Sequence, residues 1–330
     1  MRVRATSDLH LSGRTADWVF AALDKVLTGC DGIVVLCGDI FDQPEMVSMP
    51  LFNRLRGRLR DAAPTEVYVI AGNHDQYEAP RNCLEALEGG NVTVVSEPLW
   101  TPIGLMVPYQ PPSEWREVVT GMGPATAGVA PVLWAHQGFK GAYMNRMRRD
   151  TSGLPVADLP AKVLVTGHYH MAQNLGYVLY CGSPFQTDFA EEGQVKSFLE
   201  WADIGTDPMP GRVPYGDIGA PRHWTIAWTP GEPMPSMPEG YRDGDKVRMK
   251  TPATRSEVKA AASELKAAGL GGVAIVAQPD TLKVSRDVVP ADASPTEAAR
   301  AFIDWREGSA TRCQPSDLHE FAEEIDLWDV

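Results

Sequence analysis

The sequence lacks the features that mark membrane-spanning, secreted and disulfide-stapled proteins. None of its apolar runs approaches the ~20 residues that a membrane-spanning helix requires. Its first residues enter a strand-like segment without the apolar core of a signal peptide. Its five cysteines are odd in number and include no Cys-x-x-Cys pair, which is typical of reduced thiols. We therefore expect a cytoplasmic protein that does not contact a membrane.

Basic residues are too few for a protein that binds nucleic acid over its whole surface. The chain has 30 Lys and Arg against 43 Asp and Glu, a formal net charge of −13. A nuclease is still possible, because carboxylates that bind metals count in this total while the bound cations do not. The sequence also has no Gly-x-x-x-x-Gly-Lys-Ser/Thr loop, so ATP-driven steps would need another subunit.

Histidine is scarce as well, and its distribution is the most informative feature of the chain. Five of the seven histidines lie in four short motifs, and a fifth motif at residues 38–42 (Gly-Asp-Ile-Phe-Asp) falls between the first two. The four motifs are Asp8-Leu9-His10, Gly72-Asn73-His74-Asp75, Ala135-His136-Gln137 and Gly167-His168-Tyr169-His170. Asp, Asn and neutral His bind Mn²⁺, Fe or Zn²⁺ through oxygen and nitrogen. The pattern predicts a site for two metal ions.

Each motif follows a short apolar run that is typical of a buried strand. The runs are residues 3–7, 33–36, 67–70, 132–134 and 163–165. Helix-like stretches at 15–27 and about 50–62 separate the first three, so we expect an α/β fold with its site at the carboxyl ends of the strands. One His or Asp after a strand is usually a turn or cap residue, whereas five matched positions favour a shared site. Asp42 and Asp75 fit either a supporting contact or a turn, and His223 and His319 lie outside every motif.

In these residues the chain resembles the calcineurin-like metallophosphoesterases, whose pattern is DxH, GDxxD, GNHD, an isolated His and GHxH. All five elements occur in order across about residues 6–170. Within that superfamily, residues 7–11, 38–42 and 182–189 resemble the SbcD-type nuclease subunits of double-strand-break repair and phage recombination. The last segment, with Glu191-Glu192-Gly193 and Lys196-Ser197-Phe198 behind it, distinguishes this branch from generic phosphodiesterases.

The resemblance implies a layered metallophosphoesterase β-sandwich core flanked by helices, with two divalent metal ions, usually Mn²⁺. It implies that one ion is held by Asp8, His10 and His170. It implies that the other is held by Asn73, His136 and His168, with Asp39 bridging the two. His74 would then be the catalytic histidine, oriented by Asp75. Two such cations neutralise a phosphodiester and lower the pKa of a shared water, and this ligand set disfavours structural zinc and Mg²⁺.

We expect three parts: a nuclease domain at 1–203, a small α+β capping module at 204–289 and C-terminal helices at 290–330. Residues 204–240 are rich in Pro and Gly, and the patterns at 246–250, 256–268 and 272–277 predict strand, helix and strand. In SbcD-like proteins a module in this place helps to select DNA ends. The apolar pattern of residues 290–330 predicts two amphipathic helices. The resemblance implies that these helices bind the coiled-coil root of an SbcC-type ATPase.

Two further features have open interpretations. A loop after His136 is rich in arginine, and it either contacts the DNA backbone or is an ordinary solvated loop; its arginines are Arg146, Arg148 and Arg149. The predicted helix near 50–62 has a row of leucines that belongs either to the core or to a homodimer contact, as the family implies. That row is Leu51, Leu55 and Leu59.

Three functions compete. The first is a Mn²⁺-dependent DNA exonuclease and endonuclease subunit of an SbcCD-like complex, acting on double-stranded ends and single strands. The second is a phosphodiesterase for cyclic nucleotides or other small molecules, which shares the ligand motifs but leaves residues 182–189 unexplained. The third is a non-catalytic DNA-end scaffold, against which the complete ligand set and His74 argue. A protein phosphatase is disfavoured, because no Asp-Arg-Gly follows Gly38-Asp39.

Overall fold

The computed structural model describes residues 1–78, 81–123, 132–146, 148–156, 161–206, 209–270 and 273–278. The predicted tail helices, Cys313 and His319 lie outside these residues. Across the described part, no helix combines the length and the apolar character needed to cross a membrane. The chain forms two compact units. Among the described residues, the first includes those of Met1–Ala227, Pro235–Lys250 and 273–275, and the second includes those of Trp228–Met234, 251–270 and 276–278.

The first six-stranded sheet has the strand order β14-β13-β1-β2-β3-β6. Its strands are β1 (Val3–Thr6), β2 (Ile33–Cys37), β3 (Glu66–Ile70), β6 (Val92–Val95), β13 (Ser197–Trp201) and β14 (Gly211–Pro214). Strands β1, β2, β3 and β6 are parallel, and β13 and β14 close the other edge in antiparallel pairing. All five residues of β2 are buried, as expected for an apolar strand covered on both faces.

The second six-stranded sheet has the order β11-β12-β10-β9-β8-β7. Its strands are β7 (Leu99–Thr101), β8 (Gly104–Val107), β9 (Val132–His136), β10 (Val163–Gly167), β11 (Gln173–Leu175) and β12 (Val178–Tyr180). Strands β8, β9, β10 and β12 run parallel, and the two edge strands are antiparallel. A small hairpin of β4 (Gln76–Glu78) and β5 (Arg81–Asn82) and the 3₁₀ helices η1 (Glu85–Leu87) and η2 (Phe189–Glu191) complete this part.

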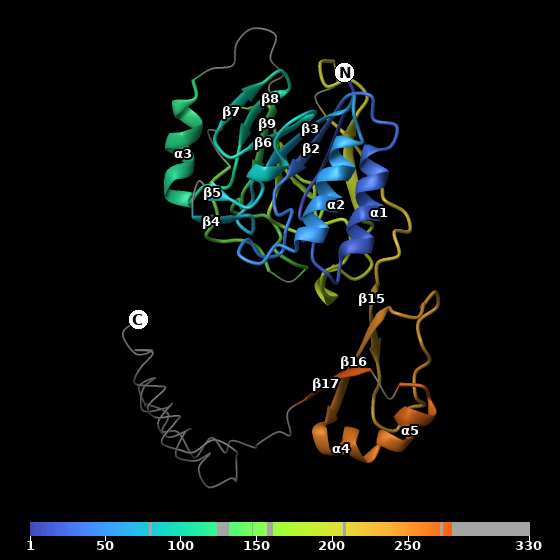
Figure 1. The fold of residues 1–330 in the computed structure, drawn as a ribbon. Helices are drawn as coiled ribbons and strands as arrows, with labels where there is room; N and C mark the ends of the chain where they lie inside the picture. Colours follow the sequence, from blue (N-terminus) through green and yellow to red (C-terminus); the bar gives the residue numbers. More distant parts are fainter. Residues whose placement is uncertain are drawn as a thin grey trace, which may run out of the picture. The chain divides into compact units, whose positions relative to one another are not determined.

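The two sheets pack face to face, and helices cover their outer faces. Side chains from both sheets form the central core, in which Trp134 of β9 meets Trp201 of β13 with ring centroids 5.3 Å apart. Helices α1 (Ala16–Leu27) and α2 (Met49–Arg60) cover the first sheet, and α3 (Pro112–Gly121) covers the second. Figure 1 shows α1 and α2 side by side on one flank and α3 on the opposite flank. The predicted layered α/β sandwich is confirmed.

The leucine row of α2 belongs to the core of this chain. Leu55 and Leu59 are fully buried against the first sheet, and Leu51 packs partly buried beside them. The face of α2 that we considered for a homodimer contact is therefore already covered by the protein itself at Leu55 and Leu59. The arginines between the leucines lie at the surface, where Arg58 pairs with Asp24 of α1 at 2.7 Å.

A third sheet has the order β15-β16-β17, with β15 (His223–Ala227) parallel to β16 (Lys246–Thr254). Strand β17 spans Ala274–Gln278. The predicted helix at 256–268 is present as two short helices, α4 (Arg255–Ala260) and α5 (Ala262–Ala267), interrupted at Ala261. Thr254 and Glu257 begin α4 as a reciprocal capping box, and Gly269, with a φ of 77°, follows α5 as expected.

Candidate metal centre

The seven predicted ligands lie at the carboxyl ends of five parallel strands. They follow or end β1, β2 and β3 of the first sheet and β9 and β10 of the second; they are Asp8, His10, Asp39, Asn73, His136, His168 and His170. Backbone and side-chain hydrogen bonds join the two sheet edges here. Nδ1 of His136 lies 2.7 Å from the carbonyl oxygen of Cys37, and the amide of His168 donates to Asp8 Oδ1 at 3.0 Å. The strand ends thus bring distant segments to one place.

The backbone is left-handed at four of these residues. The φ angles of Asp8, His10, Asp39 and His168 are 54°, 45°, 53° and 84°. Such conformations cost about 1–3 kcal/mol for residues other than glycine and persist where surrounding contacts impose them, often at functional sites. Here the amide of Asp8 donates to Gly38 O and that of His10 to Asp39 O, both at 3.0 Å.

One group of ligand atoms gathers around Asn73. Its Oδ1 lies 3.1 Å from His136 Nε2 and 2.9 Å from His168 Nδ1, and His136 Nε2 lies 3.2 Å from Asp39 Oδ2. Because Nδ1 of His136 donates its proton to Cys37 O, the Nε2 lone pair of the neutral ring faces the two oxygens. Oxygen and nitrogen lone pairs meet at this distance only with a proton or a cation between them.

The charges around His136 also favour a proton or a cation at its Nε2. Burial alone lowers the pKa of His136, but the nearby Asp39 and Asp8 carboxylates override it and raise the pKa to about 9. A proton on Nε2 therefore neutralises the site when no cation does so. For His168 the balance is opposite, because burial and the neighbouring His136 lower its pKa to about 4. A metal ion would displace the proton from His136, so metal affinity should rise with pH.

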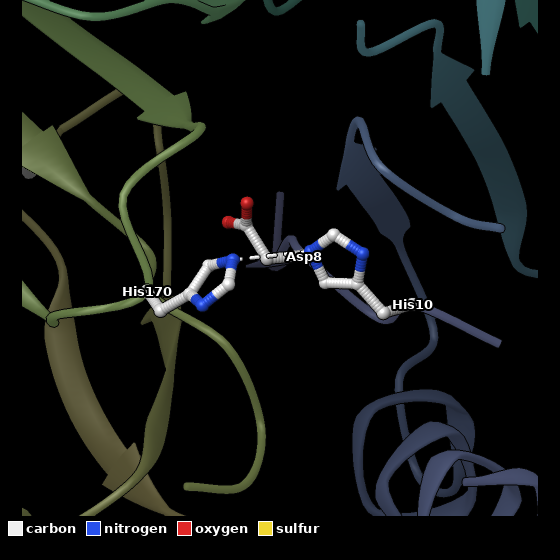
Figure 2. Close-up of side chains that lie close together, drawn as sticks. All are labelled: Asp8, His10 and His170. Carbon is white, nitrogen blue, oxygen red and sulfur yellow. Dashed lines mark hydrogen bonds between the residues drawn. The ribbon is translucent and has the colours of Figure 1, made fainter. Parts of the chain in front are cut away.

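The second group comprises Asp8, His10 and His170, whose ligand atoms all lie within 4.8 Å of one another. Figure 2 shows the two imidazoles approaching from opposite segments, with the Asp8 carboxylate beside them. His10 Nε2 and His170 Nε2 are 3.1 Å apart. Oδ1 of Asp8 accepts from the His168 amide, and Ser7 Oγ donates to Oδ2 of Asp8. These contacts fix the carboxylate beside the two rings.

Asp39 lies between the two groups. Its Oδ2 is 3.2 Å from His136 Nε2 and 3.9 Å from His10 Nε2, while its Oδ1 accepts from the His74 amide at 2.9 Å. Burial by itself raises the pKa of Asp39, but His136, His10 and His74 together hold that pKa well below its usual range. The carboxylate is therefore ionised, and one oxygen faces both groups, as a bridging ligand requires.

The residues present fit divalent cations. Buried carboxylates and imidazole nitrogens converge, and Asp8, Asp39 and His136 form another set whose ligand atoms lie within 4.8 Å. Nitrogen and oxygen ligands without a thiolate suit Mn²⁺, Fe or catalytic Zn²⁺. Gly38 and Gly167 leave room for this packing, because a Cβ on Gly38 would lie 2.2 Å from His136 Nδ1 and one on Gly167 2.4 Å from Cys37 O.

His74 is exposed beside the second group, its ring centroid 5.0 Å from that of His10. Our expectation that Asp75 orients this ring is wrong. Nδ1 of His74 lies 2.9 Å from the carbonyl oxygen of Asp42, which orients the ring instead. If Nδ1 donates to that carbonyl, Nε2 is left for a substrate. Asp42 itself, with Oδ1 3.5 Å from His10 Nδ1, is a candidate ligand neighbour that the sequence left open.

Asp75 is fully buried and accepts backbone hydrogen bonds. The amides of Ile40, Phe41 and Gly72 donate to its carboxylate at 3.0, 3.1 and 2.9 Å. Burial and the charge of Asp39 raise the pKa of Asp75 to about 7, against the effect of these amides. A buried carboxylate needs such donors, so Asp75 joins residues 39–41 to the 72–75 turn and positions Asp39 and Asn73.

A hollow of about 260 Å³ opens beside His168. Arg148 and Arg149 line it, but the Arg149 guanidinium stacks on Tyr143 at 4.3 Å and donates to its hydroxyl. Arg146 donates to the carbonyl oxygen of Glu192. All three arginines are exposed, and among the described residues Arg148 lines this hollow without such a side-chain contact.

The sequence motifs did not reveal Tyr109, which also lines the hollow and stacks on His168 with ring centroids 6.1 Å apart. It comes two residues after β8, a parallel strand of the second sheet. The rule that sites follow such strands could have found it if that strand had been predicted. His223, in contrast, lies in β15 and packs against Phe189.

A family model described as calcineurin-like phosphoesterase matches residues 1–172. Among solved structures, the E. coli phosphoesterase YfcE is 16% identical, with a TM-score of 0.34, covering 66% of this chain and 100% of that one. A single mutant of Vps29 from Entamoeba histolytica is 18% identical, with a TM-score of 0.33 and coverages of 65% and 99%. Wild-type Vps29 of that organism, complexed with Zn²⁺, is 17% identical, with a TM-score of 0.32 and coverages of 66% and 100%. No curated protein matches.

Proposed function

The chain belongs to the calcineurin-like phosphoesterase family, and from this premise we propose that it is a Mn²⁺-dependent DNA exonuclease and endonuclease. It would act in the cytoplasm as the nuclease subunit of an SbcCD-like repair or recombination complex. One observation carries the proposal: seven side chains from five strand ends converge, with the Asp39 carboxylate between the two groups that the other six form. Such a cluster is suited to phosphodiester hydrolysis with two cations.

The contacts within the two groups of side chains support the proposed ligand assignment. Asp8, His10 and His170 would hold one ion, and Asn73, His136 and His168 would hold the other, with Asp39 shared by both. When bound, a pair of cations would neutralise the phosphodiester and lower the pKa of a bound water molecule. His74 presents Nε2 beside the cluster, where, with both ring nitrogens protonated, it would stabilise developing charge or donate the Nε2 proton to the leaving oxygen.

Two features favour DNA over a small phosphodiester. Arg148 lines the hollow beside His168 and offers a cation to a neighbouring phosphate. The segment 182–196, which resembles the nuclease branch of the family, packs directly behind His170. Both lie next to the ligand cluster, so a chain with net charge −13 still offers one exposed arginine beside the cluster to a polyanion.

Both proposed partners, an ATPase and a second copy of this chain, are inferred from the sequence. An SbcC-type coiled-coil ATPase would bind the tail at 290–330, which lies outside the described residues. A homodimer would use surface other than Leu55 and Leu59, since both are buried in the core. The absence of a phosphate-binding loop in the sequence is consistent with an ATPase supplied by a second subunit.

The test is a panel of substrates assayed with the full chain and Mn²⁺: linear duplex DNA, a DNA hairpin, a cyclic nucleotide, a nucleotide monophosphate and bis-p-nitrophenyl phosphate. We expect both DNAs and the chromogenic diester to be hydrolysed, and the His136→Ala variant to hydrolyse none. Hydrolysis of the cyclic nucleotide with intact DNA would establish the small-molecule alternative. Turnover of no substrate, with DNA bound, would establish a scaffold.

A further inference from the structure

Residues 182–196 hold the backbone of His170 from two directions. The amide of Ser183 donates to His170 O at 3.1 Å, and Lys196 Nζ donates to the same oxygen at 2.9 Å. The ammonium of Lys196 also donates to Ser183 Oγ at 3.0 Å and to Glu191 Oε2 at 2.5 Å. All three of its N–H bonds thus have acceptors, and one of them is the main chain of a predicted metal ligand.

The same segment fixes the protonation of the His170 ring. Thr187 Oγ1 lies 2.9 Å from His170 Nδ1 and donates its single proton to Glu191 Oε1 at 2.6 Å. A hydroxyl that donates to a carboxylate can only accept from the imidazole, so Nδ1 of His170 carries the proton. Glu191 Oε1 is itself 3.4 Å from that nitrogen. Nε2, 3.1 Å from His10 Nε2, is therefore left with its lone pair.

Glu191 and Lys196 form a buried ion pair, with side-chain exposures of 4% and 8%. Burying two charges removes their hydration, and such pairs are often no more stabilising than apolar residues of similar volume. Glu191 accepts from Lys196 Nζ through Oε2 and from Thr187 Oγ1 through Oε1, so its carboxylate is held 3.4 Å from the imidazole nitrogen Nδ1. A carboxylate in this place raises the basicity of a ligating histidine.

We propose that Glu191 and Lys196 are positioning residues of the metal centre: through Thr187 they hold His170 with its Nε2 lone pair directed at the ion shared with Asp8 and His10. The inference depends on the proposed function, because it concerns the metal affinity of the same site. The inference also gives residues 182–196, which lie outside the ligand motifs, a role at the metal centre. Both residues are buried and contact His170, so both act through that ligand.

The neighbouring Glu192 supplies a matched control. Its carboxylate accepts from the amide and the hydroxyl of Thr225 in β15, and so points to another part of the first unit. Glu191→Gln and Glu192→Gln thus make the same chemical change one residue apart. Lys196→Met removes the ammonium while keeping an unbranched side chain one atom shorter, and Thr187→Val removes the bridging hydroxyl.

The experiment titrates the metal-free full chain with Mn²⁺ by calorimetry and by electron paramagnetic resonance. We expect the wild type and Glu192→Gln to bind two ions and to show the spectrum of a coupled pair. In Glu191→Gln, Lys196→Met and Thr187→Val, one ion should bind about 10- to 100-fold more weakly. At a Mn²⁺ concentration that saturates the wild type, these variants should show the spectrum of an isolated ion.

Circular dichroism establishes that each variant is folded, and if Lys196→Met is not, Glu191→Gln carries the test because it keeps the side-chain volume. Folded Glu191→Gln and Thr187→Val proteins that bind both ions as the wild type does would overturn the inference and leave a purely structural role. Equal weakening in Glu192→Gln would also overturn it. A wild type that binds no pair of ions would instead overturn the proposed function, so the two failures are distinguishable.

Discussion

Four of the seven predicted ligands have positive φ angles: Asp8, His10, Asp39 and His168. Because L-residues with side chains avoid this region, the surrounding hydrogen bonds must compensate a cost of about 1–3 kcal/mol for each. Local sequence preferences would not place His10 or His168 in such conformations. The motifs predicted which residues gather, but the backbone geometry that gathers them emerges only from the packed sheets.

His74→Ala tests the role of the exposed histidine. Its ring is oriented by the Asp42 carbonyl. It is not one of the seven predicted ligands, although a ring nitrogen lies within 4.8 Å of ligand atoms of His10 and Asp42. The variant should therefore fold and bind Mn²⁺ as the wild type does, while hydrolysis of the diester falls roughly 10²- to 10⁴-fold, as expected when a general acid is removed. Steady-state kinetics with bis-p-nitrophenyl phosphate measure the loss. Full activity in the metal-loaded variant would remove the catalytic role.

Glu191 predicts a pH dependence of stability. Its pKa is about 2 in the folded protein against an ordinary value of 4.5, so its ionised form stabilises the fold above about pH 4.5. This contribution, roughly 3 kcal/mol, is lost as the pH falls from about 4.5 towards 2. The free energy of unfolding of the metal-free wild type should exceed that of Glu191→Gln at pH 6, and the difference should shrink below pH 4.5. Urea unfolding at a series of pH values measures it, and a difference that grows on acidification would contradict the assignment.

The roles of Asp75 and Tyr109 were not predicted from the residues next to them in the sequence. Asp75 accepts from amides that lie as far as 35 residues away, and no local pattern encodes that pairing. Because Asp75 directly follows His74, we predicted that the Asp75 side chain orients the His74 ring. In the structure the carbonyl oxygen of Asp42 contacts that ring instead. Tyr109 follows a strand whose apolar run was not recognised in the sequence.

At the scale of elements, the strands were predictable and the loops were not. The apolar runs before each ligand motif correspond to β1, β2, β3, β9 and β10, because a strand buried on both faces must be apolar along its length. The predicted helix at 256–268 is divided at Ala261, and its two halves bury only Leu265. A helix with so little buried surface has little tertiary packing to hold it continuous.

The three arginines of the loop after β9 make different contacts, so we expect their substitutions to affect DNA cleavage differently. Arg148 lines the hollow beside His168, whereas Arg146 is bonded to Glu192 O and Arg149 is held on Tyr143. Arg148→Ala should weaken DNA cleavage and reduce its salt dependence by about one phosphate contact, while sparing bis-p-nitrophenyl phosphate. Arg146→Ala and Arg149→Ala are the matched controls and should have smaller effects. The contact with DNA is refuted by an equal loss on both substrates in Arg148→Ala.

At the scale of the whole molecule, the fold follows from the alternation of buried strands and amphipathic helices, and the order of the motifs identified its family. The pairing of the two sheets was implied by the resemblance and not by periodicity, because periodicity does not say which strands become neighbours. The hydrogen bond from His136 to Cys37 O joins the two sheets at the site. Folding and assembly of the ligand cluster are therefore one process.

The most direct test of the central claim is a crystal of the full chain grown with excess Mn²⁺ and measured for anomalous scattering at the manganese edge. Two peaks about 3.5–4 Å apart are expected, one bounded by Asp8, His10 and His170, the other by Asn73, His136 and His168, with Asp39 in contact with both. A map without such a pair, or with these side chains turned away from the peaks, would contradict the account.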